Sequence, residues 1–593
     1  MCGFLAAFGP SLNLHRARLC ELGNLLRHRG PDSSQSTSGD EYLFLFHRLA
    51  IQDPNPRSDQ PMSDGTGRYT LVFNGELFNY LELREELMTR GTSFRTTSDS
   101  EVLLNGLIAH GKAFLSRIDG MYSFVFWDSQ EKSLLIARDP FGIKPLYYIF
   151  SNGLLLIASE PRPLRQFASD TVCPLQLAEL LVFRHTPFAS SPFQKVKSLA
   201  GGHCLVGSLE QLREDIFTDT LDLLEQSSNT DPALDVESIR EALFRSFQLH
   251  TRSDVGYALQ LSGGVDSSLV AVFCAAEKKQ KLSSYGIFLP DCVYDESQYR
   301  ASVVDRYQLD HFEIEITGID YADALLEAIT ALDAPTPHYG CVALFLLCRE
   351  VSKKHKVLLT GEGADELFGG YSRYTRLSEY TSVKPSDDKE LRAELPQNSV
   401  LFASAYTDPT EIKKLFPDLN YNFVARADIA ARFPDISRQM MSLDHQCYLP
   451  SLLMRQDRVA MAHGVEARVP YVDIALARSV ARIPLDRRLS PTRTKPLLKN
   501  IAYHYLDHQL IDRRKNGLLL PLRSWLKDEK SLGRYVSALT EPSARLAAYT
   551  DRRRMRSFVE EQVHQSGSET TPALMQVLNV ELWLRSLDIV PSL

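Results

Sequence analysis

Cysteine is scarce in this sequence and is not spaced for metal binding or for a disulfide framework. Nine cysteines are scattered over 593 residues, and no two of them form a Cys-x-x-Cys pair. This distribution is typical of reduced thiols in a cytosol and argues against a small secreted, disulfide-rich domain. We therefore expect a cytoplasmic protein held together by its hydrophobic cores.

Long apolar runs and an excess of positive charge are also missing. No stretch approaches the roughly 20 apolar residues that span a bilayer. The opening MCGFLAAFG lacks the charged start and the long apolar core of a secretory signal. The formal net charge is −8, whereas affinity for nucleic acid depends on clustered Lys and Arg. These absences predict neither a membrane nor a nucleic-acid partner.

The first 160 residues predict an α+β domain. Helical spacing of apolar residues occurs at 80–90 and 100–118. The remaining apolar segments are short, rich in β-branched and aromatic residues, and separated by polar turns, which favours antiparallel hairpins. These expected strands are 2–9, 42–51, 69–75, 121–128, 133–139, 145–151 and 153–159.

A different pattern begins after a polar, acidic segment at 211–235, which we interpret as a linker. Strand-like segments at 256–261, 283–289, 311–316 and 356–360 alternate with helical ones, which predicts a parallel, doubly wound sheet. From about residue 375 the chain is expected to be mostly helical. The expected division is a first domain at 1–210, the linker, and a second domain at 236–593.

One apparent phosphate-binding motif is a false match. GLIAHGKA (106–113) fits the opening of GxxxxGK, but Ala113 stands where the Mg²⁺-binding Ser or Thr belongs. The stretch also lies within a helical pattern instead of following a strand. It is predicted to be a surface helix.

Cys2 is the first candidate for chemistry. Removal of Met1 would leave a cysteine with a free α-amine, whose pKa of about 8 suits it to act as the base for its own thiol. Four motifs follow it: RHRGPD (27–32), HRLAIQD (47–53), FNGELFNY (73–80) and TTSDSE (96–101). In this order and spacing they resemble the class II glutamine amidotransferase domain, an N-terminal-nucleophile hydrolase of stacked antiparallel sheets.

That resemblance implies a set of roles. Cys2 would attack the side-chain amide of glutamine, giving a γ-glutamyl thioester and ammonia. Asn74 and the backbone N–H of Gly75 would form the oxyanion hole, in which each donor contributes about 2.7–4 kcal/mol. Arg48 would hold the α-carboxylate of glutamine and Asp99 its α-ammonium, and Glu76 would complete the glutamine site.

The second half carries two loops that each follow a strand. SGGVDSS (262–268) offers glycines, hydroxyls and a helix start to an anion, without the Lys of a Walker A loop. LLTGEGADELFGGY (358–371) places carboxylates beside it. Carboxylates next to a phosphate-binding loop indicate Mg²⁺, although an acidic helix start explains them equally well.

Together with YLPSLLMRQDRVAMAHGVEARVPYVD (448–473) and TKPLLK (494–499), these loops resemble the glutamine-hydrolysing asparagine synthetases over almost the whole chain. The resemblance implies a PP-loop domain that uses ATP and releases AMP and pyrophosphate. Lys495 would stabilise the α-phosphoryl group and Glu362 would act as general base. The metal ligands would be Asp266 and Asp365. The implied ATP-binding residues are Leu261, Ser262, Gly263, Gly264, Asp266, Ser267, Ile287, Thr360 and Gly361.

The acceptor is less well defined by the sequence. Relatives that amidate aspartate carry a TxRAS-like segment whose Arg holds the acceptor, but here the stretch reads DAPTPHYGCVALFLLC (333–348), with His338, Tyr339 and Cys341. Arg468, Glu362, Asp365 and the pair His338–Tyr339 are the remaining candidates for binding aspartate. His338 can equally be a packed loop residue.

Aspartate is therefore the leading acceptor, and another carboxylic acid is the runner-up. A third hypothesis is that the protein is a β-lactam-synthetase-type enzyme, which forms an intramolecular amide. It is disfavoured because the complete set of Cys2, Arg48, Asn74, Gly75 and Asp99 would be dispensable there. Members of the family are often dimers, so a homodimer is one expectation, and the oligomeric state stays open.

Overall fold

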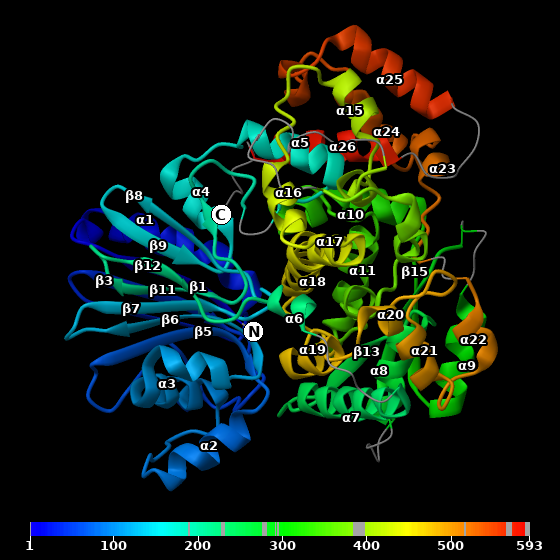
Figure 1. Ribbon diagram of the computed structural model, residues 1–593. Helices are drawn as coiled ribbons and strands as arrows, with labels where there is room; N and C mark the ends of the chain where they lie inside the picture. The colour runs from blue at the N-terminus through cyan, green and yellow to red at the C-terminus, as the bar shows by residue number, and fades with distance from the viewer. Residues whose placement is uncertain are drawn as a thin grey trace.

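Two antiparallel sheets stacked face to face make up the first part of the molecule (Figure 1). The computed structural model describes residues 2–187, 190–226, 232–275, 281–290, 292, 296–383, 398–514, 517–564 and 572–587. The strands are β1 (Cys2–Phe8), β2 (Ser33–Ser38), β3 (Tyr42–Arg48), β4 (Met62–Ser63), β5 (Tyr69–Leu77), β6 (Gly120–Asp128), β7 (Ser133–Arg138), β8 (Tyr147–Ser151), β9 (Leu154–Ala158), β10 (Lys197–Ser198), β11 (His203–Ser208) and β12 (Arg213–Ile216). Their orders are β10-β8-β9-β1-β3-β2 and β12-β11-β7-β6-β5-β4. This is the stacked-sheet N-terminal-nucleophile fold that the motifs implied.

Alternation along the strands divides the side chains between two faces. Cys2, Phe4 and Phe8 of β1 point between the sheets, where they pack with Val125 and Ile136. Leu5 and Ala7, which alternate with them, face helices instead. Helices α1 (Leu12–Gly23) and α4 (Pro161–Ala168) cover the outer side of one sheet, and α2 (Tyr80–Thr89) and α3 (Asp99–His110) cover the other. The false phosphate motif lies at the end of α3 and in the following 3₁₀ turn η3 (Gly111–Arg117), as expected for a helix.

Among the described residues of the segment at 211–235, which we interpret as a linker, several form regular elements. Its first part is the strand β12, which pairs with β11 from His203↔Ile216 to Val206↔Arg213 and forms the edge of the second sheet. Helix α6 (Asp222–Glu225) follows, and α7 (Pro232–His250) has begun before residue 235. This short, polar edge strand lacks the apolar alternation by which strands are recognised, because none of its four residues is buried on either face.

The second half is built on a parallel sheet, as expected. Its strands are β13 (Tyr257–Gln260), β14 (Ser283–Phe288), β15 (Asp310–Glu315), β16 (Val357–Leu359) and β17 (Glu466–Arg468), in the order β15-β14-β13-β16-β17. All four strand pairs are parallel. Leu259 and Leu359 pack on one face and Ala258 and Leu358 on the other. Both faces are therefore covered, as parallel sheets require.

Helices surround this sheet and make up most of the remaining chain. They are α5 (Pro174–Phe183), α8 (Val265–Ala275), α9 (Ser297–Tyr307), α10 (Gly318–Leu332), α11 (Gly340–Val351), α12 (Ala364–Phe368), α14 (Val400–Ser404), α15 (Pro409–Leu415), α16 (Val424–Ala431), α17 (Ile436–Leu443), α18 (Leu449–Met461), α19 (Ile474–Ala481), α20 (Leu485–Arg488), α21 (Pro496–Ala502), α22 (His508–Asp512), α23 (Leu522–Lys527), α24 (Gly533–Val536), α25 (Arg552–His564) and α26 (Pro572–Ser586). Within the described ranges, no helix combines the length and the apolar character that crossing a bilayer demands.

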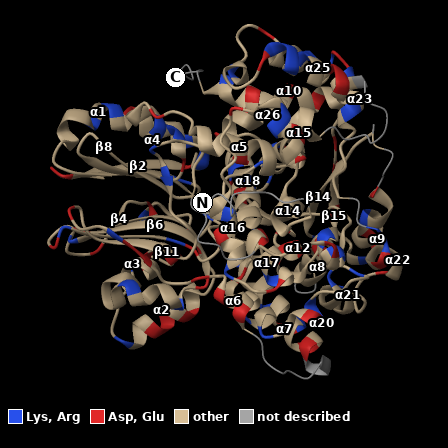
Figure 2. Cartoon of the chain, turned by 45° about the horizontal axis from the view of Figure 1, so that its top comes forward, with Lys and Arg blue, Asp and Glu red and all other residues tan. Residues whose placement is uncertain are grey.

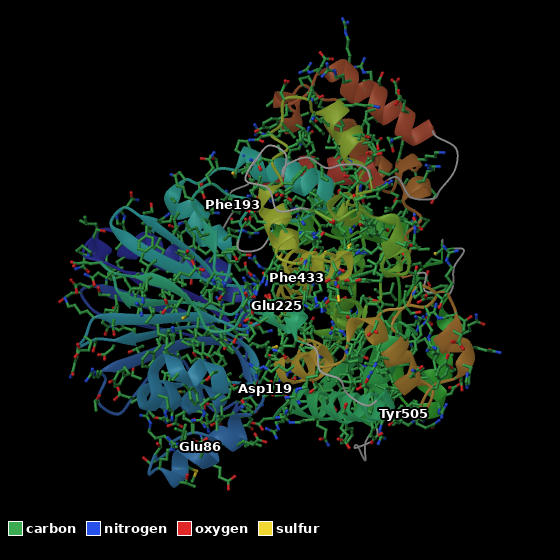
Figure 3. All side chains as sticks on the ribbon, in the orientation of Figure 1. Glu86, Asp119, Phe193, Glu225, Phe433 and Tyr505 are labelled. Carbon is green, nitrogen blue, oxygen red and sulfur yellow. The ribbon has the colours of Figure 1, made fainter. Side chains whose placement is uncertain are left out.

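The two halves share an extensive boundary. Helix α26 lies against α5, where Gln576 donates from Nε2 to the carbonyl oxygen of Leu180 at 2.7 Å. Asp119, labelled at this boundary in Figure 3, shares a hydrogen bond with the carboxyl group of Asp473. Acidic and basic residues are interspersed over both halves (Figure 2). The boundary therefore contains buried polar groups that belong to both halves.

Candidate active sites

The candidate nucleophile lies at the start of β1, next to an asparagine with a spare hydrogen-bond donor. The backbone N–H of Cys2 donates to Asn74 Oδ1 at 2.9 Å. Among the described residues, the buried Asn74 Nδ2 has no hydrogen-bond partner. A buried amide donor without a partner is costly unless a ligand satisfies it. Its position beside Cys2 suits an oxyanion-hole donor.

Gly75 follows Asn74 on β5, at a point where the strands β5 and β6 approach closely. A Cβ atom added at Gly75 would lie 2.1 Å from the carbonyl oxygen of Met121. Only glycine fits at that separation. The sequence motif is therefore explained by packing as well as by its implied role in the oxyanion hole.

The thiol of Cys2 is not activated by its surroundings alone. Burial raises the pKa of the Cys2 thiol, so the neutral thiol predominates near pH 7. Attack on an amide therefore requires a nearby base. The α-amine that removal of Met1 would create is the base that the sequence implies.

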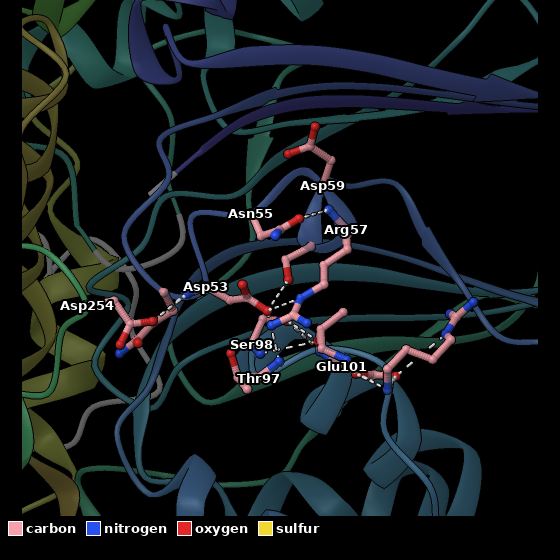
Figure 4. A network of polar contacts seen from close by, with 12 residues as sticks. Asp53, Asn55, Arg57, Asp59, Thr97, Ser98, Glu101 and Asp254 are labelled. Atoms are coloured by element: carbon pink, nitrogen blue, oxygen red, sulfur yellow. Dashed lines mark hydrogen bonds and ion pairs between the residues drawn. The ribbon is translucent and has the colours of Figure 1, made fainter.

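Arg48 pairs with Cys2 across β1 and β3, and its guanidinium braces a loop. Nη1 donates to Asp59 at 2.6 Å and to the carbonyl oxygen of Asn55 at 3.0 Å, and Nη2 donates to the carbonyl oxygens of Gln52 and Asp53. Figure 4 shows this loop, with the backbone N–H of Asp53 bonded to Asp254 of the second half at 2.7 Å. Arg48 thus shapes the loop beside Cys2, and a role in holding glutamine remains a proposal.

Two buried carboxyl groups complete this site. Asp99 begins α3 and accepts from the backbone N–H of Leu77 at 3.0 Å. Burial raises the pKa of Asp99 to about 6, although the Leu77 N–H opposes the shift. Burial, together with Glu466 and Asp99, raises the pKa of Glu76 well above its usual range. A buried acidic pair of this kind offers a binding place for an ammonium group.

The second candidate site lies at the carboxyl ends of β13 and β16. These strands are neighbours in the parallel sheet, so the loops after them meet at one edge. In the loop SGGVDSS, the Ser262 and Ser267 hydroxyls are 3.0 Å apart, and Gly264 N–H donates to Ser262 Oγ at 3.2 Å. Gly263 has a φ of +84°, which only glycine adopts readily. The loop is therefore preformed at the start of α8.

A cavity of about 920 Å³ opens between these two loops. Its lining includes nine of the residues that the sequence assigned to ATP, metal or catalysis: Leu261, Ser262, Gly264, Asp266, Ser267, Ile287, Gly361, Glu362 and Asp365. Gly263, Thr360 and Lys495 lie next to it. The carbonyl oxygen of Gly263 accepts from Arg513 Nη2 at 3.2 Å, and Thr360 is buried beneath the loop.

Lys495 joins the two carboxylates that were expected to bind Mg²⁺. Its Nζ is 2.6 Å from both carboxylate oxygens of Asp266 and 2.7 Å from Asp365 Oδ1. The carboxylates therefore converge on one point beside the phosphate-binding loop. Mg²⁺ is usually held by one or two carboxylates plus substrate phosphates, so this donor set fits the ion.

Several charged residues in the cavity were not assigned from the sequence. Arg455 on α18 donates to Glu362 Oε1 at 2.6 Å and fixes the expected general base. Tyr371 hydrogen-bonds to Glu366, whose pKa is raised to about 8 by burial and by Asp365. The other cationic lining residues are Arg300, Arg493, Lys499, Arg513 and Arg514. The motif LMRQDR contains Arg455, and helical spacing alone did not reveal that it faces the site.

Of the acceptor candidates His338, Tyr339 and Arg468, only His338 lines the cavity in the described part of the chain. His338 lines the cavity together with Leu344 and Leu518. The Tyr339 hydroxyl instead donates to the carbonyl oxygen of Pro572 at 2.8 Å. Arg468 is fully buried between the two halves and does not line the cavity. The expectation that Arg468 contacts the acceptor is therefore wrong, because its side chain is committed to the boundary.

Comparisons with known proteins agree with both sites. Residues 238–585 match the family model described as asparagine synthase, and residues 1–218 match the glutamine amidotransferase domain. Asparagine synthetase [glutamine-hydrolyzing] 1 of Bacillus subtilis is 29% identical over 568 residues, which cover 89% of this chain and 88% of that protein. A putative asparagine synthetase [glutamine-hydrolyzing] of Mycobacterium bovis is 30% identical over 584 residues, with the same coverage of 89% and 88%.

The asparagine synthase model alone spans more than half of the chain, and the loops that it covers are those that line the large cavity. The amidotransferase model covers the stacked sheets that hold Cys2 and Asn74. The chain therefore belongs to the asparagine synthase family, and it is a glutamine-dependent ligase with a glutamine amidotransferase domain and ATP as a substrate.

Proposed function

We propose that the protein converts aspartate to asparagine, with glutamine as the nitrogen donor and AMP and pyrophosphate as the products of ATP. The observation that carries this proposal is the convergence of Asp266 and Asp365 on Lys495 beside the loop SGGVDSS. A loop without the Walker A lysine, with carboxylates for a metal and one lysine nearby, suits adenylation of a carboxylate. The relatives' names support aspartate as the acceptor.

In the first site, Cys2 Sγ attacks the side-chain carbonyl carbon of glutamine. After Met1 has been removed, the α-amine of Cys2 takes the thiol proton and passes it to the leaving ammonia. The oxygen that becomes negative lies near Asn74 Nδ2, the unpartnered buried donor, and Gly75 N–H is the second donor. Water then releases glutamate from the thioester. Asp99 and Glu76 hold the α-ammonium of glutamine, and Arg48 its α-carboxylate.

In the second site, a carboxylate oxygen of the acceptor attacks the α-phosphorus of ATP and pyrophosphate leaves. Lys495 neutralises charge on the α-phosphoryl group. Ammonia attacks the acyl carbon, AMP leaves, and Glu362 takes the proton that ammonia loses. Arg455 keeps Glu362 in place for that role. Bound Mg²⁺, held by Asp266 and Asp365, would neutralise phosphate charge.

A second acceptor class is favoured by one feature of the cavity. The cavity lining contains several leucines besides His338, and an arginine of the TxRAS type is missing from the sequence at 333–348. Among these leucines are Leu289, Leu344, Leu347, Leu518 and Leu519. This lining suits a carboxylic acid with a larger apolar body than aspartate.

An acceptor screen tests both candidates. Pyrophosphate release is measured with glutamine and ATP at millimolar concentrations of aspartate, and then with a series of longer and more apolar carboxylic acids. Aspartate-dependent release, with asparagine formed in equal amount, supports the proposal. Release that depends on another acid moves the assignment to that acid. Stoichiometric ADP and orthophosphate would overturn adenylation itself.

A further inference from the structure

One arginine of the ATP half extends to the glutamine site. Arg468 ends β17, the edge strand of the parallel sheet, and it is fully buried. Its backbone pairs with Leu359 of β16, and its carbonyl oxygen accepts from the backbone N–H of Thr360 at 2.9 Å. Thr360 directly precedes Gly361 and Glu362. The backbone of Arg468 is thus fastened to the loop of the ATP site.

The side chain of Arg468 points the other way, across the boundary. Its Nε donates to Glu466 Oε1 at 2.5 Å, and its Nη1 donates to the carbonyl oxygens of His250 at 2.8 Å and Arg252 at 2.6 Å. These three partners belong to the ATP half and fix the guanidinium. The remaining group, Nη2, makes no hydrogen bond within the described residues and lies 3.5 Å from Glu76 Oε1 of the amidotransferase half.

Glu76 is next to Gly75 and two residues beyond Asn74, so its position is tied to the oxyanion donors. It is buried, and two other carboxyl groups, Glu466 and Asp99, raise its pKa. Arg468, whose Nη2 lies 3.5 Å from Glu76 Oε1, is a cation that opposes those two. Without a positive charge at this place, three acidic groups would share one dry region, which is unfavourable for every ionised member.

The same region has a second connection across the boundary. Arg252, whose carbonyl oxygen Arg468 holds, donates from Nη1 to the carbonyl oxygen of Phe78 at 2.7 Å and pairs with Glu82. Phe78 lies two residues after Glu76. Arg468 therefore contacts strand β5 directly, through Glu76. It also holds the backbone of Arg252, and the side chain of Arg252 contacts Phe78, the residue that follows β5.

We propose that Arg468, which belongs to the ATP half, is a positioning residue of the glutamine site. Its side chain holds Glu76, and so fixes the position of β5, the strand that carries Asn74 and Gly75, relative to the ATP-site loop that contains Thr360. The proposal rests on the proposed function only in that the first site hydrolyses glutamine. It predicts that the amidotransferase half alone lacks part of its glutamine site.

The main test is the variant Arg468→Lys, because lysine keeps the charge but cannot reproduce the fork that contacts Glu466 and two carbonyl oxygens at once. The KM for glutamine in the glutaminase reaction should rise about tenfold, a size typical of coupled neighbours. Pyrophosphate release with added ammonium should stay within about twofold, since the bond to Thr360 is made by the backbone and coupling to other sites is weak.

A matched control is available at the same boundary. Arg426 on α16 is equally buried and pairs with Glu179 on α5 at 2.6 Å, so it also joins the two halves. Arg426→Lys should lower the melting temperature without changing the KM for glutamine. If both lysine variants raise that KM equally, Arg468 contributes only general stability to the boundary and the proposal is overturned.

A double-mutant cycle with Glu76→Gln tests whether Arg468 affects the KM for glutamine through Glu76. If Arg468 acts through Glu76, the double variant has the KM of Glu76→Gln to within about twofold; effects that multiply would contradict the proposal. Should Arg468→Lys not fold, Glu466→Gln keeps the arginine but loosens its Nε, and an unchanged KM for glutamine there would also contradict it. Failure of the ligase function is separate, because it would appear as absent ammonium-dependent pyrophosphate release in the wild-type protein.

Discussion

The two candidate sites differ in how much of each is already built. The glutamine site is buried, and its main groups sit on regular strands: Cys2 on β1, Arg48 on β3 and Asn74 on β5. The ATP site is an open cavity of about 920 Å³ whose groups sit on loops after strands and in the first turns of the helices that follow them. The first site is fixed by register within each sheet and by the stacking of the two sheets, whereas the second is assembled by loops that must admit a nucleotide and an acceptor.

This difference indicates which substitutions should inactivate each site. In the strand-built site, one backbone distance, that between Gly75 and Met121, leaves no room for any side chain. In the loop-built site, Asp266 and Asp365 are held together by a side chain, that of Lys495. We therefore expect substitutions in the first half to stop ammonia production alone, and those around the cavity to stop synthesis from any nitrogen source.

The largest effect should come from Cys2→Ala. Glutaminase activity should fall by about 10⁴-fold or more, because loss of a covalent nucleophile removes the reaction path. Synthesis with added ammonium should remain, since Lys495 and Glu362 are untouched. Glutamate release and product formation are measured side by side, with the exposed Cys20→Ala as the control. A folded Cys2→Ala protein that cannot use ammonium would show that the two sites are not separable.

The converse substitution is Lys495→Met. Synthesis should fall about 10³-fold with either glutamine or ammonium, because charge on the transferring phosphoryl group loses its cation. Glutaminase activity should be preserved. Pyrophosphate release and glutamate release report the two halves separately, and Lys353→Met, at the surface pair with Glu350, serves as the control. Equal loss of both activities would contradict independent sites.

The motifs of the first half name residues that the structure brings together, since Cys2 and Asn74 are hydrogen-bonded across the two stacked sheets. Cys2, Asn74 and Gly75 lie at positions where strand pairing leaves little freedom, and their motifs carry that constraint. Arg455 and Arg468 were harder to place, since each depends on how distant segments pack. The edge strand β12 was missed because its polar residues show no alternation. Tertiary contacts, which no local pattern encodes, account for these differences.

A smaller effect is expected for Asn74→Ala. One oxyanion-hole donor contributes about 10²- to 10³-fold to acyl-transfer rates, and Asn74 also accepts the Cys2 backbone N–H at 2.9 Å. The kcat for glutamine hydrolysis should fall by about 10²-fold, with ammonium-dependent synthesis unchanged. A thermal melt checks that the buried site still folds. If kcat were unchanged and only KM rose, Asn74 would bind glutamine without stabilising the oxyanion.

The smallest expected effect is a dependence of glutamine binding on pH that the ATP site should not share. The pKa of Asp99 is raised to about 6 by burial, so the carboxylate that would pair with the glutamine α-ammonium is lost as the pH falls through 6. The KM for glutamine should rise about fivefold from pH 6 to pH 5, while the KM for ATP with ammonium as nitrogen source stays nearly constant.

Unfolding would not reproduce that profile, because titration of Asp99 makes the folded state more stable, not less, as the pH falls. Its folded pKa of about 6 lies above the unfolded value of about 3.9. The folded state therefore binds the proton more tightly, and this contribution to stability is lost as the pH rises between those values. Asp99→Asn should show a high KM for glutamine at every pH with no inflection near 6. An inflection that survives in Asp99→Asn would assign the titration to another group, with Glu76 as the next to test.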